Sequence, residues 1–186
     1  MKQKAALFDF DGTLFDTEPL NFAGYAHALK QIGYCLTKEE FHTYNGMTFK
    51  QFLPLIFPTM PLEEMLAIRK DKDAYYQSHL SLIRPNEALF SLLETIAPTY
   101  HIGLVTTSRL PNILPVLRQF GKQDCFEFII TGEDVTQLKP HPECYHKAMQ
   151  HWNLSPQDTI IFEDSPVGVA AAKASGAQVF VVQQFQ

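Results

Sequence analysis

Cysteine is scarce in this sequence, basic residues are fewer than acidic residues, and long apolar runs are absent. The cysteines Cys35, Cys125 and Cys144 are odd in number and lack CxxC spacing, which indicates reduced thiols in a cytoplasmic protein rather than a disulfide scaffold. Lys and Arg total 15 against 20 Asp and Glu, a formal charge of −5, whereas duplex nucleic acid is bound by clustered Lys and Arg. No apolar run approaches the roughly 18 residues of a membrane span. We therefore expect no nucleic-acid partner and no membrane partner.

The apolar content is ample for a hydrophobic core. The chain has 186 residues, 46% of them hydrophobic, and this length predicts one domain, or one domain that carries a smaller insertion. Five short segments read mostly as continuous apolar runs, which are typical of parallel strands buried on both faces. Helix-length patterns between the last four complete an α/β fold. The predicted strands are residues 4–10, 101–106, 126–131, 159–162 and 178–182, and the predicted helices between them are residues 111–121, 142–152 and 165–176.

Residues 17–83 follow a different pattern, because they lack convincing strands and are helical in character. Thr37 and Glu40 have the spacing of a capping box, and Asn45-Gly46 is a turn signal. Arg84-Pro85 marks the return to the sheet. We predict a helical subdomain at residues 17–83, inserted between the two segments of the core, residues 1–16 and 84–186.

The strongest chemical signal is Asp9-Phe10-Asp11-Gly12-Thr13, directly after the first predicted strand. Residues i and i+2 of an extended chain point the same way, and ligands of open parallel sheets bind at the carboxyl ends of strands. Of two carboxylates at this place, one could act as a nucleophile and the other could donate and accept protons. A Mg²⁺ ion would offset the repulsion between them. The alternative is an ordinary turn or helix cap.

Three further candidates follow later strands. Thr106, with the backbone N–H groups of Thr107 and Ser108, could cradle an anion or simply cap a helix. Lys139, between Leu138 and Pro140, could place a charge near an anionic substrate or be a solvated surface lysine. The pair Glu163-Asp164 could hold a cation or cap the next helix.

The four candidate sites are stronger evidence for a functional site when they are considered together. Three of them close predicted parallel strands, and Lys139 lies on the connection after one, so all are expected at one edge of one sheet. Two acid pairs, a hydroxyl and an ammonium group have complementary charges for a metal ion plus a phosphate group. We therefore predict a site at this edge that binds both.

The order and spacing of these residues resemble the four motifs of the haloacid dehalogenase superfamily of phosphohydrolases, over essentially the whole chain. Asp16-Thr17-Glu18-Pro19 resembles the branch of sugar phosphatases and β-phosphoglucomutase, in which a helical cap is inserted at this point. The resemblance implies a Rossmann-like parallel sheet core with an inserted small helical cap, residues 17–83.

The resemblance also implies roles for individual residues. Asp9 would become an aspartyl phosphate, and Asp11 would protonate the leaving oxygen and then activate water. The Asp11 main-chain carbonyl and Asp164 would hold Mg²⁺, with Glu163 helping directly or through water. The expected catalytic residues are thus Asp9 and Asp11, the phosphate-binding residues are Thr106, Thr107 and Lys139, and the metal ligands are Asp9, Asp11, Glu163 and Asp164.

Some positions depart from the mutase pattern. Mutases of this type carry a basic residue on the cap loop after the glycine, where this chain has Phe49 followed by Lys50. They also have a histidine shortly after the Asp-Thr pair, near which Asn21 stands here. Arg109 is either an extra phosphate contact or a surface residue. Family members usually continue beyond the fifth strand. A chain ending at Gln186 is therefore either truncated or leaves that sheet edge poorly covered, with apolar surface exposed.

We expect a Mg²⁺-dependent phosphatase that hydrolyses a small phosphorylated metabolite, above all a sugar phosphate, through an aspartyl-phosphate intermediate. The main alternative is a β-phosphoglucomutase-type isomerase. A carbon–halogen hydrolase of this fold needs only the first carboxylate, so the presence of Asp11 argues against that activity. A non-catalytic binding protein is disfavoured because the acids Asp9, Asp11 and Asp164 are all present. Nothing indicates a coiled coil, so a monomer is expected.

Overall fold

The computed structural model describes residues 2–44, 47–183 and 185. The chain divides into two compact units, Met1–Asp16 with Arg84–Gln186, and Thr17–Ile83. The turn predicted at Asn45-Gly46 lies outside the described residues. None of the helices in the described ranges combines the length and the apolar character needed to cross a membrane.

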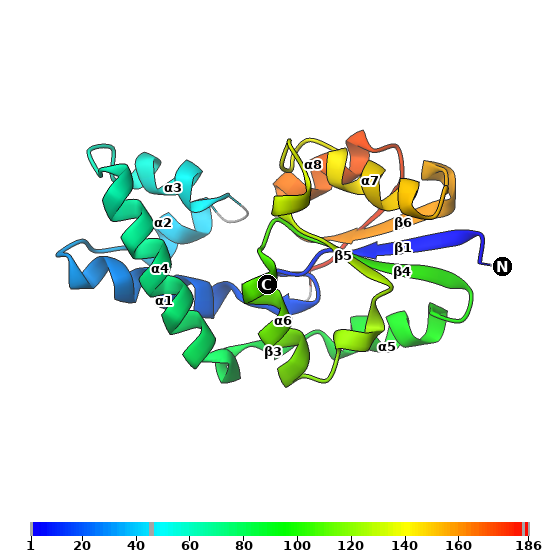
Figure 1. Ribbon diagram of the computed structural model, residues 1–186, viewed down its shortest axis with the longest axis horizontal. Helices are drawn as coiled ribbons and strands as arrows, with labels where there is room; N and C mark the ends of the chain where they lie inside the picture. The colour runs from blue at the N-terminus through cyan, green and yellow to red at the C-terminus, as the bar shows by residue number, and fades with distance from the viewer. Residues whose placement is uncertain (1, 45–46, 184, 186) are drawn as a thin grey trace. The chain divides into compact units, whose positions relative to one another are not determined.

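The first unit is built on a five-stranded sheet whose neighbouring strands all run parallel, which confirms the predicted α/β class. The strand order is β5-β4-β1-β6-β7, with β1 at the centre (Figure 1). The chain extends the sheet first to one side of β1 and later to the other, and this arrangement places a ligand crevice at the carboxyl end of the central strands. The strands are β1 Lys4–Phe8, β4 Tyr100–Val105, β5 Phe128–Ile130, β6 Thr159–Glu163 and β7 Gln178–Val181.

Four α-helices of this unit cover both faces of the sheet. In Figure 1, α7 and α8 lie above the sheet, and α5 and α6 lie below it. Both faces of the central strands are therefore buried, which explains their continuous apolar sequences. The helices are α5 Glu87–Ile96, α6 Leu110–Gln119, α7 Glu143–His151 and α8 Pro166–Ala174, and short 3₁₀ turns occupy η2 Gln123–Cys125, η3 Gly132–Asp134 and η4 Pro156–Asp158.

The core lies between these layers. Leu7 and Ile161 from the sheet belong to one buried cluster with Ala171 and Ala172 of α8, whose small side chains let that helix lie close to the strands. On neighbouring strands, the rings of Phe8 and Phe162 stack at 4.5 Å between centroids. At the edge, β7 leaves Phe180 58% exposed.

A two-stranded antiparallel pair, which the sequence patterns did not predict, lies where the chain leaves and re-enters this unit. Strand β2, Phe15–Asp16, pairs with β3, Arg84–Pro85. The Arg84 guanidinium forms an ion pair with the Asp16 carboxylate. Two residues are too few for a periodicity signal, so only the contact between distant segments reveals this pair.

The second unit, residues 17–83, is helical throughout its regular structure. A buried aromatic and aliphatic cluster holds the helices together, and α1 packs on α4 where Gly24 faces Lys72. The predicted capping box of Thr37 and Glu40 is confirmed, with the Glu40 amide donating to Thr37 Oγ1 at 3.2 Å. The elements are α1 Glu18–Gln31, α2 Lys38–Thr43, α3 Phe49–Ile56, α4 Leu62–Ser78 and the 3₁₀ turn η1 Leu80–Leu82.

Candidate active site

The first acidic motif follows β1 directly. The Asp9 amide donates to the Phe162 carbonyl at 3.0 Å, so the extended backbone continues past the last residue of β1 and carries Asp9 to the end of the sheet. Its side chain is almost entirely buried. Gly12 then adopts φ +81°, and a Cβ built on it would lie 2.1 Å from Asp164 Oδ2. The chain can therefore turn here and approach the second acidic motif only because residue 12 is glycine.

The second acidic motif lies beside the first. Glu163 is the last residue of β6, and Asp164 is the next residue. One carboxylate oxygen from each of Asp9, Glu163 and Asp164 lies within 4.8 Å of the others. Strands β1 and β6 are neighbours in the sheet, so their carboxyl ends bring together acids that are more than 150 positions apart in the sequence.

Lys139 connects the two motifs. Its Nζ donates to Asp9 Oδ1 at 2.7 Å, to Glu163 Oε1 at 2.6 Å and to the Val105 carbonyl at 3.1 Å. Burial disfavours the charged ammonium, but the Asp9 and Glu163 carboxylates outweigh this effect and hold the pKa of Lys139 well above its usual value. The side chain is therefore a buried cation, not a solvated surface lysine.

The carboxylates are perturbed in the opposite sense. Burial raises the pKa of Asp9 well above its usual value, and the charges of Glu163 and Asp164 raise it further, while Lys139 lowers it. Burial and the charge of Glu163 likewise raise the pKa of Asp164 to about 7. Protons thus compete for these oxygens, first because the carboxylates are buried and also because negative charge exceeds positive charge in the cluster.

This donor set fits a hard divalent cation. Asp9, Glu163 and Asp164 offer only oxygen, the ligand type that Mg²⁺ prefers. A cation at their junction would balance the surplus negative charge that raises the pKa of Asp9 and Asp164.

The end of β4 adds hydroxyl groups to the same edge. Thr106 is buried, and its amide donates to the Ile130 carbonyl at 2.9 Å. Its Oγ1 accepts from the Ser108 amide at 3.0 Å, a turn that orients the following residues. Ser108 Oγ in turn donates to Asp11 Oδ2 at 2.5 Å. Thr107, between them, is half-buried, and its carbonyl oxygen lies 2.8 Å from a Cβ built on Gly132.

The sequence patterns did not predict the side-chain roles of three residues that support the acids. Thr13 Oγ1 donates to Asp164 Oδ1 at 2.8 Å, Tyr145 Oη donates to Glu163 Oε1 at 2.9 Å, and Ser108 contacts Asp11 as described. Thr13 and Ser108 each lie two residues after a predicted site residue, Asp11 and Thr106, so their positions carried a weak signal. Tyr145 is an ordinary buried position on α7, and no spacing distinguishes it.

Comparison with known proteins shows which family and which relatives this chain is similar to. The family described as haloacid dehalogenase-like hydrolase matches residues 6–182. A phosphorylated carbohydrates phosphatase from Thermotoga maritima is 27% identical over 181 residues, which are 94% of this chain and 82% of that protein.

Solved structures agree in fold. CbbY from Rhodobacter sphaeroides, in complex with phosphate, superposes with a TM-score of 0.87 at 26% identity and covers 100% of this chain and 88% of its own. The β-phosphoglucomutase from Clostridium difficile has a TM-score of 0.83 at 25% identity and covers 100% of this chain and 86% of its own.

Proposed function

The chain belongs to the haloacid dehalogenase-like hydrolase family, and from this premise we propose that it is a phosphatase that releases inorganic phosphate from a small phosphorylated carbohydrate. The observation that carries the proposal is the junction of Asp9, Glu163 and Asp164 within 4.8 Å, with the Lys139 ammonium 2.7 Å from Asp9. The name of the Thermotoga relative supports the class of substrate.

Asp9 is the proposed nucleophile. Its carboxylate oxygen attacks phosphorus, the bond from phosphorus to the leaving oxygen breaks, and an aspartyl phosphate forms. The hydrogen bond from Lys139 to Oδ1 fixes the carboxylate, and the nearby ammonium reduces the repulsion between an anionic nucleophile and an anionic phosphate. Water then attacks the aspartyl phosphate, which returns Asp9 and releases phosphate.

Asp11 is the proposed acid and base. It protonates the leaving oxygen in the first step and accepts a proton from water in the second. The Ser108 hydroxyl, 2.5 Å from Asp11 Oδ2, holds this carboxylate in a defined orientation before substrate arrives. A residue that must deliver a proton to one oxygen benefits from such positioning.

The transferring phosphoryl group would be held by Thr106, Thr107 and Lys139. Thr106 and Thr107 follow β4, the strand next to β1, so they lie at the same edge of the sheet as Asp9. A hydroxyl, backbone N–H groups and an ammonium together match the oxygens of a phosphoryl group.

The proposed metal site uses carboxylate oxygens of Asp9, Glu163 and Asp164, which lie within 4.8 Å of one another, together with the main-chain carbonyl of Asp11. When bound, Mg²⁺ would neutralise charge on the phosphoryl oxygens during transfer. Residues 17–83 form the proposed cap, which would exclude bulk water and select the carbohydrate.

Activity assays test this function. We expect hydrolysis of p-nitrophenyl phosphate that requires Mg²⁺ and stops on chelation with EDTA. Asp9→Asn removes the nucleophile, so turnover should fall on the order of 10⁴-fold or more. Asp124→Asn, which changes an exposed acid in the same way, is the control. Full hydrolysis by Asp9→Asn protein would show that Asp9 is not the nucleophile.

A substrate panel separates the phosphatase from the isomerase alternative, which the likeness to the Clostridium structure keeps relevant. Phosphorylated sugars and phosphoglycolate are incubated with enzyme and Mg²⁺ and followed by ³¹P NMR. Release of inorganic phosphate from a sugar phosphate is the expected result. Migration of phosphate between two positions of one sugar, without release, would identify an isomerase instead.

A further inference from the structure

We infer that Asn86 is a positioning residue for the proposed metal site. It fixes the backbone of the loop that follows Asp11, and Thr13 of this loop holds the Asp164 carboxylate in place. The inference deepens the proposed function and rests on it, because Asp164 is a proposed metal ligand. Asn86 belongs to none of the acidic or phosphate-binding motifs, so its role follows from tertiary contacts alone.

The loop from Phe10 to Phe15 is a tight turn that is closed by its own backbone. The amides of Leu14 and Phe15 both donate to the Phe10 carbonyl, at 3.2 and 3.0 Å. The Gly12 amide donates to the Phe15 carbonyl at 2.8 Å. These bonds keep the residues of the turn in place relative to one another. The position of the whole turn relative to the second acidic motif is then decided by its contacts with other segments.

The Asp164 carboxylate lies directly against this turn. Thr13 Oγ1 donates to Asp164 Oδ1 at 2.8 Å. On the other oxygen, Oδ2 lies 2.1 Å from a Cβ built on Gly12, so it occupies the volume that a side chain there would take. The carboxylate therefore takes its position from residues 12 and 13. A shift of the turn would displace a proposed metal ligand, and metal affinity is sensitive to the groups that orient the ligands.

Asn86 holds this turn from the segment where the chain returns to the first unit. Its backbone amide donates to the Leu14 carbonyl at 2.8 Å, and its side-chain Nδ2 donates to the Thr13 carbonyl at 3.1 Å. One residue thus binds two successive carbonyls of the turn. Asn86 and Thr13 are both buried. A buried carbonyl that loses its donor is unfavourable, so the turn would move to recover a partner.

The other end of the Asn86 side chain is anchored in a helix. Its Oδ1 accepts from the Leu89 amide at 3.1 Å, and its main-chain carbonyl accepts from the Phe90 amide at 3.0 Å. The side chains of Leu89 and Phe90 are buried, so the start of α5 is fixed in the core. A side-chain amide carries its acceptor and its donor on separate atoms. Asn86 can therefore cap the helix with the oxygen while it binds the turn with the nitrogen.

Asn86→Ser separates these two contacts. Serine caps helices about as well as asparagine, but its side chain ends one atom short of Nδ2, so the bond to the Thr13 carbonyl is lost. We expect the dissociation constant for Mn²⁺, followed by EPR, to rise roughly threefold to tenfold. Asn86→Ala, which loses the cap as well, should show the same rise together with a lower urea midpoint of unfolding.

A double-mutant cycle tests whether Asn86 acts through Thr13. Thr13→Val keeps the shape of the side chain but removes the hydroxyl bond to Asp164, and it should raise the dissociation constant for Mn²⁺ on the order of tenfold. If Asn86 serves to place this hydroxyl, the double variant should bind Mn²⁺ within about twofold of Thr13→Val alone. Losses that multiply in the double variant would overturn the inference, and so would wild-type binding in Asn86→Ser.

Ile113→Val is the matched stability control. Ile113 is fully buried in α6 of the same unit, and the loss of one methylene group lowers the urea midpoint without removing a polar contact. Its dissociation constant for Mn²⁺ should equal that of wild type. An equal rise in Ile113→Val and Asn86→Ser would overturn the inference, because general loosening of the unit would then explain both.

Phosphate release supplies a second readout. At limiting Mg²⁺, Asn86→Ser should hydrolyse p-nitrophenyl phosphate more slowly than wild type, and saturating Mg²⁺ should restore kcat, because only the placement of a metal ligand is weakened. A kcat that stays low at saturating Mg²⁺ would overturn the inference. A wild-type protein that binds Mn²⁺ but releases no phosphate would refute the proposed function, and the cycle would still decide the role of Asn86. A wild-type protein that binds no Mn²⁺ would refute both.

Discussion

At the scale of single residues, the site depends on two glycines as much as on its acids. The missing side chain of Gly12 leaves space for the Asp164 carboxylate, and that of Gly168 leaves space for the Glu163 carboxylate. A Cβ at either position would overlap these groups. Buried carboxylates at close range repel one another, so their positions must be imposed by the surrounding backbone. The glycines allow the backbone to come close enough to do so.

Gly12→Ala is expected to damage the site as well as the fold. The left-handed backbone at φ +81° costs a non-glycine residue about 1–2 kcal/mol, and the new methyl group would displace Asp164. Phosphatase activity and Mn²⁺ affinity should both fall by more than tenfold. Urea unfolding, EPR and a phosphate-release assay measure the three effects.

Gly121→Ala provides the matched control. Gly121 also has a positive φ, +63°, but a Cβ there would meet nothing within 4 Å. It should lose similar stability and keep full activity. If both variants lose activity equally, the overlap with Asp164 does not matter for the site.

At the scale of elements, short caps fix the ends of segments that border the site. Asn86 Oδ1 accepts from the Leu89 amide at the start of α5, and its Nδ2 donates to the Thr13 carbonyl at 3.1 Å. Ser165 caps α8 in the same way. Thr131 and Asp134 cap η3, the turn whose Gly132 lies against Thr107. Caps thus tie loop backbone near the site to rigid elements.

The η3 cap gives a pH-dependent prediction. The Thr131 amide donates to Asp134 Oδ2 at 2.8 Å, and this bond together with the Thr131 hydroxyl lowers the pKa of Asp134. Since the pKa is lower in the folded protein, the stabilisation is present above the unfolded pKa of about 3.9 and is lost as pH falls through the lowered folded value. Asp134→Asn should therefore be about 0.5–1 kcal/mol less stable than wild type at pH 7.

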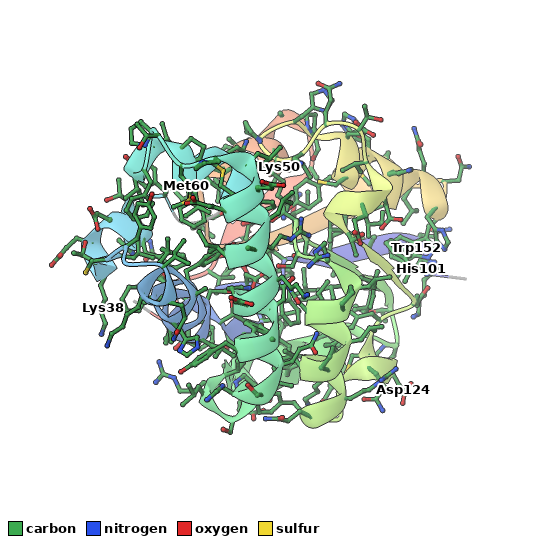
Figure 2. All side chains as sticks on the ribbon, turned by 60° about the vertical axis from the view of Figure 1, so that its left-hand side comes forward. Lys38, Lys50, Met60, His101, Asp124 and Trp152 are labelled. Atoms are coloured by element: carbon green, nitrogen blue, oxygen red, sulfur yellow. The ribbon has the colours of Figure 1, made fainter. Side chains whose placement is uncertain are left out.

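Urea unfolding measured from pH 7 downward checks this prediction. The difference between Asp134→Asn and wild type should shrink as the pH drops below about 4. Asp124→Asn, an exposed acid labelled in Figure 2, removes the same charge and should leave stability almost unchanged. A difference that persists undiminished at low pH would show that the Asp134 charge contributes nothing.

At the scale of the whole molecule, the chain forms two units that each have a core of their own. The first unit encloses Cys144, whereas the second exposes Cys35. Cys125 is half-buried, and burial raises the pKa of its thiol. The three thiols therefore differ in access to solvent, and burial makes the thiols of Cys125 and Cys144 harder to ionise.

Thiol labelling should reproduce this order. Burial raises the pKa of Cys144 to about 11, so its reactive thiolate is rare at pH 8. With Ellman's reagent on the native protein, we expect one rapid equivalent from Cys35, a slower one from Cys125, and Cys144 only after denaturation. A Cys35→Ser variant should lose the rapid equivalent. Rapid reaction of all three thiols in native protein would contradict the buried position of Cys144.

The strands and the acidic motifs could be predicted because their signals are local. Continuous apolar runs mark the five parallel strands, although β1 ends at Phe8 and β5 covers only Phe128–Ile130, shorter than expected. Periodicity reports which residues are buried, whereas a strand also needs a hydrogen-bonded neighbour at each position. The prediction that Asp9 and Asp164 lie close together followed from the rule that the carboxyl ends of parallel strands lie at one edge of the sheet.

The sequence by itself therefore determined the α/β class, the family and the acids at the strand ends, since each depends on residues close together in the chain. Only the tertiary structure decided that Lys139 uses all three donors and that Tyr145 supports Glu163. Those contacts join the residue after β1, strands β4 and β6, helix α7 and the loop before α7. Such contacts depend on how side chains pack across elements, and no periodicity along the chain records that packing.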